Sequence, residues 1–122
     1  MLRRKSCTPC EKGGTSLEEK IEEELLLELS GWDLDRTGVH RLMKRFSFPG
    51  FMEAVGFANS IAILAQDEGH HPSIRIDYRK VIIELTTHAV KGLLENDFIM
   101  AAKIDRIFST SQQPGVLESA ML

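Results

Sequence analysis

Cysteine, long apolar runs and any excess of positive charge are all scarce in this chain. Two cysteines among 122 residues cannot build a disulfide-rich secreted scaffold, which favours a reducing compartment. The longest apolar run, Ile61–Ala65, is far shorter than the roughly 18 residues needed to cross a bilayer. The formal net charge is −3, whereas proteins that bind nucleic acids by bulk charge are usually basic. We therefore expect no membrane span and no direct binding to nucleic acid.

The two ends of the chain carry little pattern. Three of the first five residues are basic, but no apolar segment follows them, so we expect no secretory signal. We expect a cytoplasmic location, and an organelle stays open if a transit peptide has been removed. The composition, with 43% hydrophobic and 27% charged residues, is typical of one globular domain. The sequence predicts a loose arm with a CxxC motif over residues 1–16, one domain over 17–108 and a loose tail over 109–122.

Apolar residues recur at helical spacing in three segments. The first, over residues 17–30, is expected to open with a capping box formed by Ser16 and Glu19 and to carry a solvated acidic face. The second is expected to begin at Pro49 and end at Gly69, and the third spans residues 95–108. The predicted buried stripe of the second helix consists of Phe51, Val55, Ala58, Ala62 and Ala65.

Apolar and polar residues alternate in four further segments, which indicates two hairpins. The first hairpin covers residues 32–48 and turns near Gly38, and the second covers residues 74–87 and turns at Arg79–Lys80. Strands joined by such short links pair antiparallel. The predicted fold class is therefore α+β, in the order α-β-β-α-β-β-α, with three helices packed on one face of a four-stranded antiparallel sheet. The uncovered face is a natural place for a ligand or for self-association.

Three of the four histidines fall where predicted elements end. His70 and His71 follow the second helix, and His88 ends the last strand. Pro72 favours an extended backbone at His71, so the two neighbouring rings should point to different sides and do different jobs. Imidazole exchanges protons near neutral pH, which suits acid or base catalysis. Asp97, at the start of the last helix, could orient one of these rings.

The residues alone leave three interpretations of these histidines open: structural hydrogen bonding, a zinc site, or acid/base catalysis without a metal. Histidine suits zinc, but no carboxylate or thiolate stands at a fixed ligand spacing. His40, on an expected strand away from the group, is interpreted as a surface residue.

Cys7, Cys10 and Trp32 each have a simple structural interpretation. A Cys₄ zinc site needs two CxxC pairs and a thioredoxin-like motif follows a strand, so Cys7 and Cys10 are interpreted as two thiols of a mobile arm. An intersubunit zinc ion or disulfide remains open. Trp32, the single tryptophan, is interpreted as a core residue, with the lining of a site for a flat aromatic ligand as the alternative.

One combination of residues is more specific than any single motif. It consists of Gly69-His70-His71-Pro72, Tyr78, Leu85-Thr86-Thr87-His88, Gly92-Leu93 and Asp97. This combination resembles the signature of the pterin-4-alpha-carbinolamine dehydratases. The resemblance extends back through Gly31-Trp32 and Phe46-Ser47-Phe48 and covers roughly residues 17–108. Some members also begin with a stretch similar to Cys7–Gly14.

The resemblance implies a fold, an assembly and an activity. The fold is the four-stranded sheet with three helices, and members are dimers or dimers of dimers. They dehydrate 4a-hydroxytetrahydropterin to the quinonoid dihydropterin, which recycles the pterin used by aromatic amino-acid hydroxylases. No metal or bound cofactor is needed.

The resemblance also implies residue roles. His70 would be a principal acid or base, His88 its partner across the ring, and His71 would mainly hold and orient the pterin. Asp97 would hold a histidine. The implied substrate-binding set is Gly69, Pro72, Thr86, Thr87, Ala89 and Trp32.

Two positions depart from the family pattern. Gln66 stands four residues before the first histidine, where many members carry glutamate. Glutamine can orient a histidine but cannot stabilise an imidazolium by charge, so we expect lower histidine basicity. Leu94 stands where the last helix usually opens with Ser or Thr, and the lost cap costs about 1 kcal/mol.

The alternative function is a non-catalytic dimerisation or transcriptional-coactivator module that binds a partner's helices. An animal relative of the family stabilises the dimer of a homeodomain transcription factor in this way. The three histidines favour the enzyme, because a binding module has no need of them. A zinc hydrolase is the remaining possibility.

Overall fold

The computed structural model describes residues 1–8 and 14–111. Within these residues lie three α-helices, two short 3₁₀-helices and four strands, in the predicted α-β-β-α-β-β-α order. In chain order they are η1 (Leu2–Arg4), α1 (Glu19–Leu26), β1 (Asp33–Asp35), β2 (Arg41–Ser47), α2 (Phe51–Glu68), β3 (Ser73–Asp77), β4 (Lys80–Leu85), η2 (His88–Val90) and α3 (Glu95–Ser111). No helix in the described part of the chain is long and apolar enough to cross a membrane.

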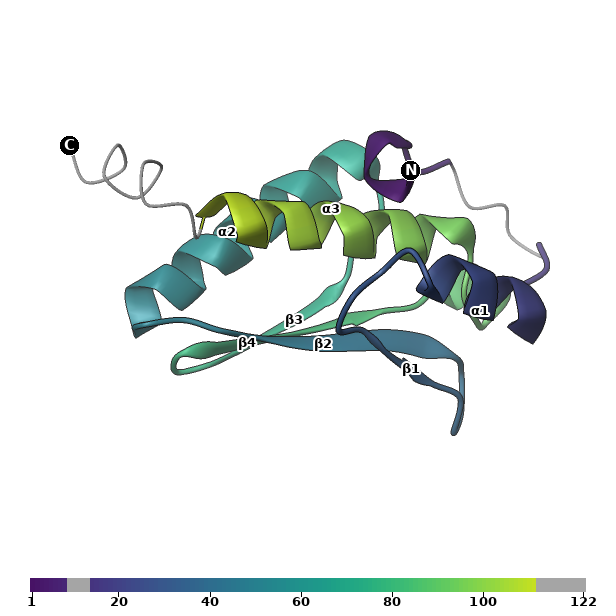
Figure 1. Cartoon of the computed structure of the whole chain (residues 1–122), viewed down its shortest axis with the longest axis horizontal. Coiled ribbons are helices and arrows are strands. Elements are labelled where there is room, and N and C mark those ends of the chain that lie inside the picture. The colour runs from purple at the N-terminus through teal and green to yellow at the C-terminus, as the bar shows by residue number, and fades with distance from the viewer. Residues whose placement is uncertain (9–13, 112–122) are drawn as a thin grey trace.

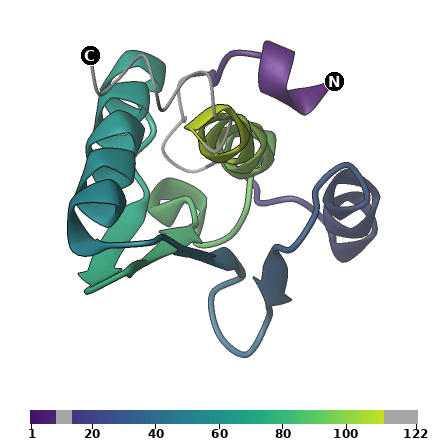
Figure 2. The same cartoon turned by 60° about the vertical axis from the view of Figure 1, so that its left-hand side comes forward.

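The four strands form one antiparallel sheet in the order β1-β2-β4-β3. The α-helices all lie on one face of it, as both views show (Figure 1, Figure 2). Side chains alternate along a strand, so Leu42 and Phe46 of β2 face the helices together with Leu85 of β4. Phe46 is the centre of the core, with ring centroids 4.9 Å from Phe57 and 5.0 Å from Phe108. The fold class is as predicted, and none of the helices within residues 1–8 and 14–111 covers the other face of the sheet.

Helix α2 ends as predicted but buries a different stripe. Gly69 has a left-handed backbone (φ 65°), which terminates the helix. Pro49 precedes the N-cap, Gly50, so the helix begins later than predicted. The prediction that Phe51 and Ala62 are buried is wrong, because Phe51 is 49% exposed and Ala62 is also on the surface. The buried residues are Ala54, Phe57, Ala58, Ile61 and Ala65. Apolar residues lie on more than one side of this helix, since Met52 and Ile63 are exposed as well as Phe51, so periodicity alone could not select the face that meets the sheet.

Helix α1 is shorter than the sequence indicated. It ends at Leu26, and its N-cap is Glu18 without a side-chain cap, so the predicted capping box is wrong. Ser16 is instead packed on Gly92, where an added Cβ would lie 2.7 Å from the Ser16 Cβ. The Leu17 amide next to it donates to the Leu93 carbonyl at 2.8 Å. The chain entering α1 is therefore attached to the segment that leads into α3.

The described part of the N-terminal arm packs against the domain. Leu2 is buried, and η1 lies beside α3 (Figure 1). The Cys7 amide donates to Glu68 Oε1 at 2.8 Å, and the Asn96 side chain hydrogen-bonds both backbone groups of Thr8. The prediction of a loose arm did not anticipate these contacts, which join residues far apart in sequence. Cys10, with the rest of residues 9–13, and residues 112–122 of the predicted tail lie outside the described residues.

Candidate active site

A pocket of about 440 Å³ opens at the uncovered face of the sheet, where strands β1 to β4 meet their loops. This volume lies within the usual range for small-molecule sites. Its lining residues are Asp35, Thr37, Gly38, Val39, Arg41, His71, Ser73, Glu84, Thr86 and His88.

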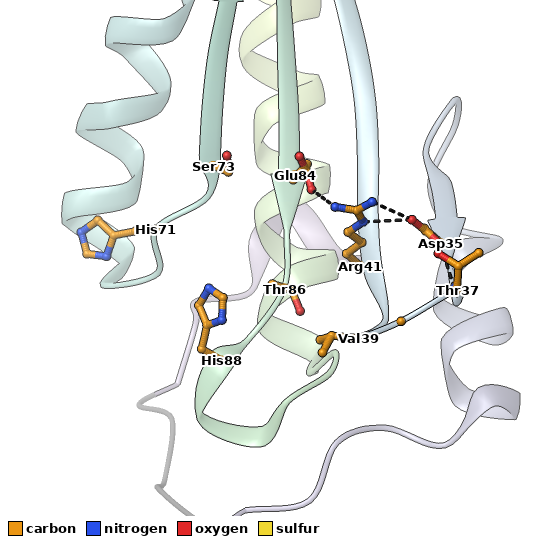
Figure 3. Close-up of a pocket in the computed structure, with 10 residues that line it drawn as sticks. Asp35, Thr37, Val39, Arg41, His71, Ser73, Glu84, Thr86 and His88 are labelled. Atoms are coloured by element: carbon orange, nitrogen blue, oxygen red, sulfur yellow. Dashed lines mark hydrogen bonds and ion pairs between the residues drawn. The ribbon is translucent and has the colours of Figure 1, made fainter.

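The pocket has two chemically different ends. His71, which follows α2, and His88, the first residue of η2, lie at one end (Figure 3). Arg41 and Asp35 lie at the other end, and Glu84 lies between these two groups. One end can therefore exchange protons, and the other presents fixed charges.

Gln66 holds the ring of His71. The His71 ring is exposed, and its Nε2 lies 2.8 Å from Gln66 Oε1 in the last turn of α2. Because an amide oxygen only accepts, this contact places a proton on Nε2 of His71. Gln66, expected to orient a histidine by hydrogen bonding, contacts the second histidine of the pair.

His70 lies behind the pocket rather than in its lining. The residue is 6% exposed, and its Nε2 lies 2.7 Å from Asp97 Oδ1. Asp97 is fully buried and also accepts hydrogen bonds from the Thr87 hydroxyl (2.8 Å) and the Leu94 amide (2.9 Å). This carboxylate, expected to hold a histidine, thus joins the end of α2, the end of β4 and the start of α3. Its bond to the Leu94 amide is one of the two hydrogen bonds of a capping box. Leu94 cannot make the other one, because leucine has no side-chain acceptor.

The remaining predicted site residues divide into two groups. Thr86 lines the pocket, and Thr87 is buried next to it on Asp97. Trp32 does not wall this pocket: it packs in the core against Phe46, and its Nε1 donates to Asp105 at 2.9 Å. The pocket lining also leaves out Gly69, Pro72 and Ala89.

Sequence reasoning missed the charged end of the pocket. Arg41 Nε and Nη2 each lie 2.9 Å from Asp35 Oδ2, and its Nη1 donates to Glu84 Oε1. Thr37 donates to Asp35 Oδ1 from both its amide and its hydroxyl. The Thr37 hydrogen bonds, followed by those from Arg41, lower the pKa of Asp35 to about 2. The sequence feature that could have indicated this end of the pocket was the charged residues at alternate, outward-facing positions of the predicted strands.

The interpretation of His40 as a surface residue on a strand is wrong. His40 lies just before β2, is partly buried, and its Nδ1 is 2.9 Å from Glu22 Oε2. Glu22 is fully buried and also accepts from Arg36 Nε at 2.9 Å. The hydrogen bonds that Arg36 donates to Glu23 and Glu22 raise the pKa of Arg36. The acidic side of α1 is therefore only partly solvated, because this cluster fastens the helix to the chain between β1 and β2.

Cys7 is a half-buried thiol about which the sequence said little. Its Sγ lies 3.7 Å from the Asn96 carbonyl oxygen. Burial, and then the charge of Glu68, raise the pKa of Cys7 to about 12. Within residues 1–8 and 14–111, no three His, Cys, Asp or Glu side chains are grouped so that they could hold a metal ion.

Comparison with known proteins gives consistent matches. Residues 15–107 match the family model described as pterin 4 alpha carbinolamine dehydratase. A Rickettsia bellii protein (strain OSU 85-389), with the provisional name pterin-4-alpha-carbinolamine dehydratase, is 47% identical over 105 residues, which cover 85% of this chain and 91% of that protein. A Vibrio vulnificus protein (strain YJ016) with the same provisional name is 44% identical over 108 residues, 88% of this chain and 98% of its own length.

Two solved structures are also similar. The crystal structure of a transcriptional coactivator/pterin dehydratase from Brucella melitensis has a TM-score of 0.71 and 32% identity, and the match covers 76% of this chain and 98% of that one. A pterin dehydratase-like protein identified as a RuBisCO assembly factor in the alpha-carboxysome has a TM-score of 0.55 and 28% identity, over 64% of this chain and 89% of its own.

Proposed function

Because this chain belongs to the pterin-4-alpha-carbinolamine dehydratase family, we propose that it dehydrates 4a-hydroxytetrahydrobiopterin to the quinonoid dihydropterin by histidine acid/base catalysis, without a metal or bound cofactor. The observation that carries the proposal is the pair His71 and His88 at one end of a pocket that can take a bicyclic ligand. The His70–Asp97 pair behind it adds a third imidazole.

The reaction needs one proton donor and one proton acceptor. A proton goes to the 4a-hydroxyl oxygen, the C4a–O bond breaks and water leaves. N5 loses its proton, and that electron pair forms the C4a=N5 double bond. Imidazoles suit both roles, because their neutral and protonated forms are both populated near neutral pH.

The proposal gives each histidine a role that its contacts support. His88 and His71 line the pocket, which supports a role in direct contact with the substrate, and Gln66 would orient His71. His70 is proposed as a further acid or base: Asp97 holds its Nε2, which leaves Nδ1 to exchange a proton, and the carboxylate stabilises the imidazolium.

The test is a stopped-flow assay of carbinolamine dehydration. We expect His70→Ala, His71→Ala and His88→Ala each to lower kcat by roughly 10²- to 10⁴-fold. His40→Gln is the matched control, because His40 lies outside the pocket lining, and it should keep the rate of the unaltered chain. An unaltered chain no faster than buffer would refute the enzyme. Three histidine variants with full activity would refute the site.

Further parts of the proposal concern the setting of the reaction. The quinonoid product would be reduced to tetrahydrobiopterin by a separate reductase before an aromatic amino-acid hydroxylase uses it again, and the chain would work as a homo-oligomer in the cytoplasm. The names of the family and of its relatives support the pterin as substrate.

A second candidate is a non-catalytic dimerisation or coactivator module that binds a partner's helices. The Brucella melitensis neighbour carries coactivator in its description, and the other neighbour is described as an assembly factor. Helix α2 also exposes Met52 and Ile63, which could meet such a partner. An unaltered chain that folds but fails the dehydration assay would favour this candidate.

A further inference from the structure

Glu84 stands in the middle of the uncovered face of the sheet. It pairs with Met43 of β2 on one side and with Ser73 of β3 on the other. Its neighbours Ile83 and Leu85 are buried under the helices, so the Glu84 side chain points to the pocket face. The side chain is 32% exposed. The carboxylate is therefore held on a rigid strand and can be reached by a ligand.

Arg41 fixes this carboxylate without using all of its acceptors. Arg41 Nη1 donates to Glu84 Oε1, while Nε and Nη2 of Arg41 are directed to Asp35 (Figure 3). Among the described residues, none donates a hydrogen bond to Glu84 Oε2. One guanidinium between two carboxylates leaves an excess of negative charge. This end of the pocket is therefore suited to accept hydrogen bonds from a ligand.

A ligand that fits the Glu84 carboxylate should present two parallel N–H donors in one plane. A carboxylate binds two parallel donors with its two oxygens, and each oxygen has room for two hydrogen bonds. A 2-amino-4-oxopteridine carries such a pair, the 2-amino group and N3–H, on the pyrimidine ring. Glu84 pairs with Ser73, and His71 lies only two residues before Ser73 and lines the same pocket, so one fused two-ring heterocycle can extend from the carboxylate toward the imidazole.

We propose that Glu84 binds the 2-amino and N3–H edge of the pterin and thereby selects 2-amino-4-oxopteridines, while Arg41 is the positioning residue that holds Glu84. The inference rests on the proposed function, because it requires a pterin in this pocket. It places the pyrimidine ring over the charged end and leaves C4a and N5 toward the imidazole end.

The test is equilibrium binding of 7,8-dihydrobiopterin and of its analogue without the 2-amino group, measured by calorimetry. The unaltered chain should prefer the 2-amino ligand by roughly 10- to 100-fold, as expected for a charge-assisted pair of hydrogen bonds. Glu84→Gln should abolish this preference by weakening only the 2-amino ligand. Arg41→Lys should keep part of the preference and Arg41→Ala less. Asp77→Asn, an exposed carboxylate on the same face outside the pocket, should keep all of it.

A Glu84→Gln chain that keeps the full preference would overturn the inference. Thermal unfolding would show whether this variant folds. If it does not, Glu84→Asp replaces it in the test, because the shorter side chain keeps the charge but moves it away from the ligand. Unchanged binding of the 2-amino ligand by Glu84→Asp would equally overturn the inference. The two proposals fail separately. An unaltered chain that shows the preference but no dehydration would refute only the enzyme, whereas dehydration with an unaltered KM in Glu84→Gln would refute only the role of Glu84.

Discussion

Asp97 illustrates how a single side chain can set the positions of several segments. Its three hydrogen bonds reach His70, Thr87 and Leu94, which lie on three different elements or their loops. A fully buried carboxylate is costly unless such partners compensate for its lost hydration. Asp97 therefore links the position of His70 to the packing of the domain, because the same carboxylate binds His70 and the start of α3.

Cys7 should behave as an unreactive thiol at neutral pH. Burial and Glu68 raise its pKa from 9.0 to about 12, and only the thiolate is nucleophilic. In a Cys10→Ser chain, alkylation of Cys7 by iodoacetamide should be slow at pH 8 and should accelerate up to about pH 12. Glu68→Gln removes a charge that raises the pKa, so it should speed the reaction at pH 8. Mass spectrometry of the modified chain gives both rates.

Two further results would bear on the prediction for Cys7. In urea the two chains should react equally fast, since the environment of Cys7 is then lost. A folded chain that is alkylated as fast as the unfolded one would contradict the prediction. Between pH 9.0 and about 12 only the unfolded chain loses this proton, so the thiol should lower stability as pH rises.

At the scale of elements, α1 is fastened by charge as well as by apolar contacts. The carboxylate of Glu22 is buried against Arg36 and His40, which belong to the chain between β1 and β2. The same helix ends at Leu26, far short of the predicted 17–30 span. Its position on the domain thus depends on partners that are distant in sequence.

Removing Glu22 should therefore destabilise the domain. We expect Glu22→Ala to lower the free energy of unfolding by about 2 kcal/mol, because it leaves the partly buried His40 ring without its acceptor and removes one of the acceptors of Arg36. The measurement is urea denaturation followed by circular dichroism. Glu24→Ala, an exposed glutamate on the same helix, is the control and should cost less than about 0.5 kcal/mol. Equal effects of the two substitutions would contradict the role of Glu22.

In the whole molecule, the α2 side of the helical layer presents an exposed apolar face. Helix α2 lies on the opposite side of the molecule from α1 (Figure 1, Figure 2). Met52 and Ile63, which are 73% and 59% exposed, share one face of α2 because they are three helical turns apart. Exposed apolar residues of this kind suit contact with another chain.

We expect this face of α2 to mediate self-association. Ile63→Glu should lower the molar mass found by size-exclusion chromatography with light scattering, because it places a charge in the contact, and should leave the thermal midpoint of the monomer nearly unchanged. Leu27→Glu is the control, since Leu27 is 87% exposed at the other end of the helical layer. A monomeric unaltered chain, or an Ile63→Glu chain of unchanged mass, would contradict this expectation.

Sequence patterns were enough to predict the order of the elements and the antiparallel pairing within each of the two hairpins. Alternation and helical spacing are local patterns, so they could be read without knowledge of any neighbour. The spacing of His70, His71, His88 and Asp97 also pointed to one region of the fold, because these residues stand where elements end.

Which residues share a surface became known only from the folded arrangement of the elements. It selected the buried face of α2, paired β2 with β4 between the two hairpins, and brought Arg41 and Glu84 together although they are 43 residues apart in sequence. Local patterns tell whether a side chain points in or out of its own element. They do not tell which distant side chain it will meet, because that depends on how the elements are stacked and on the register between strands.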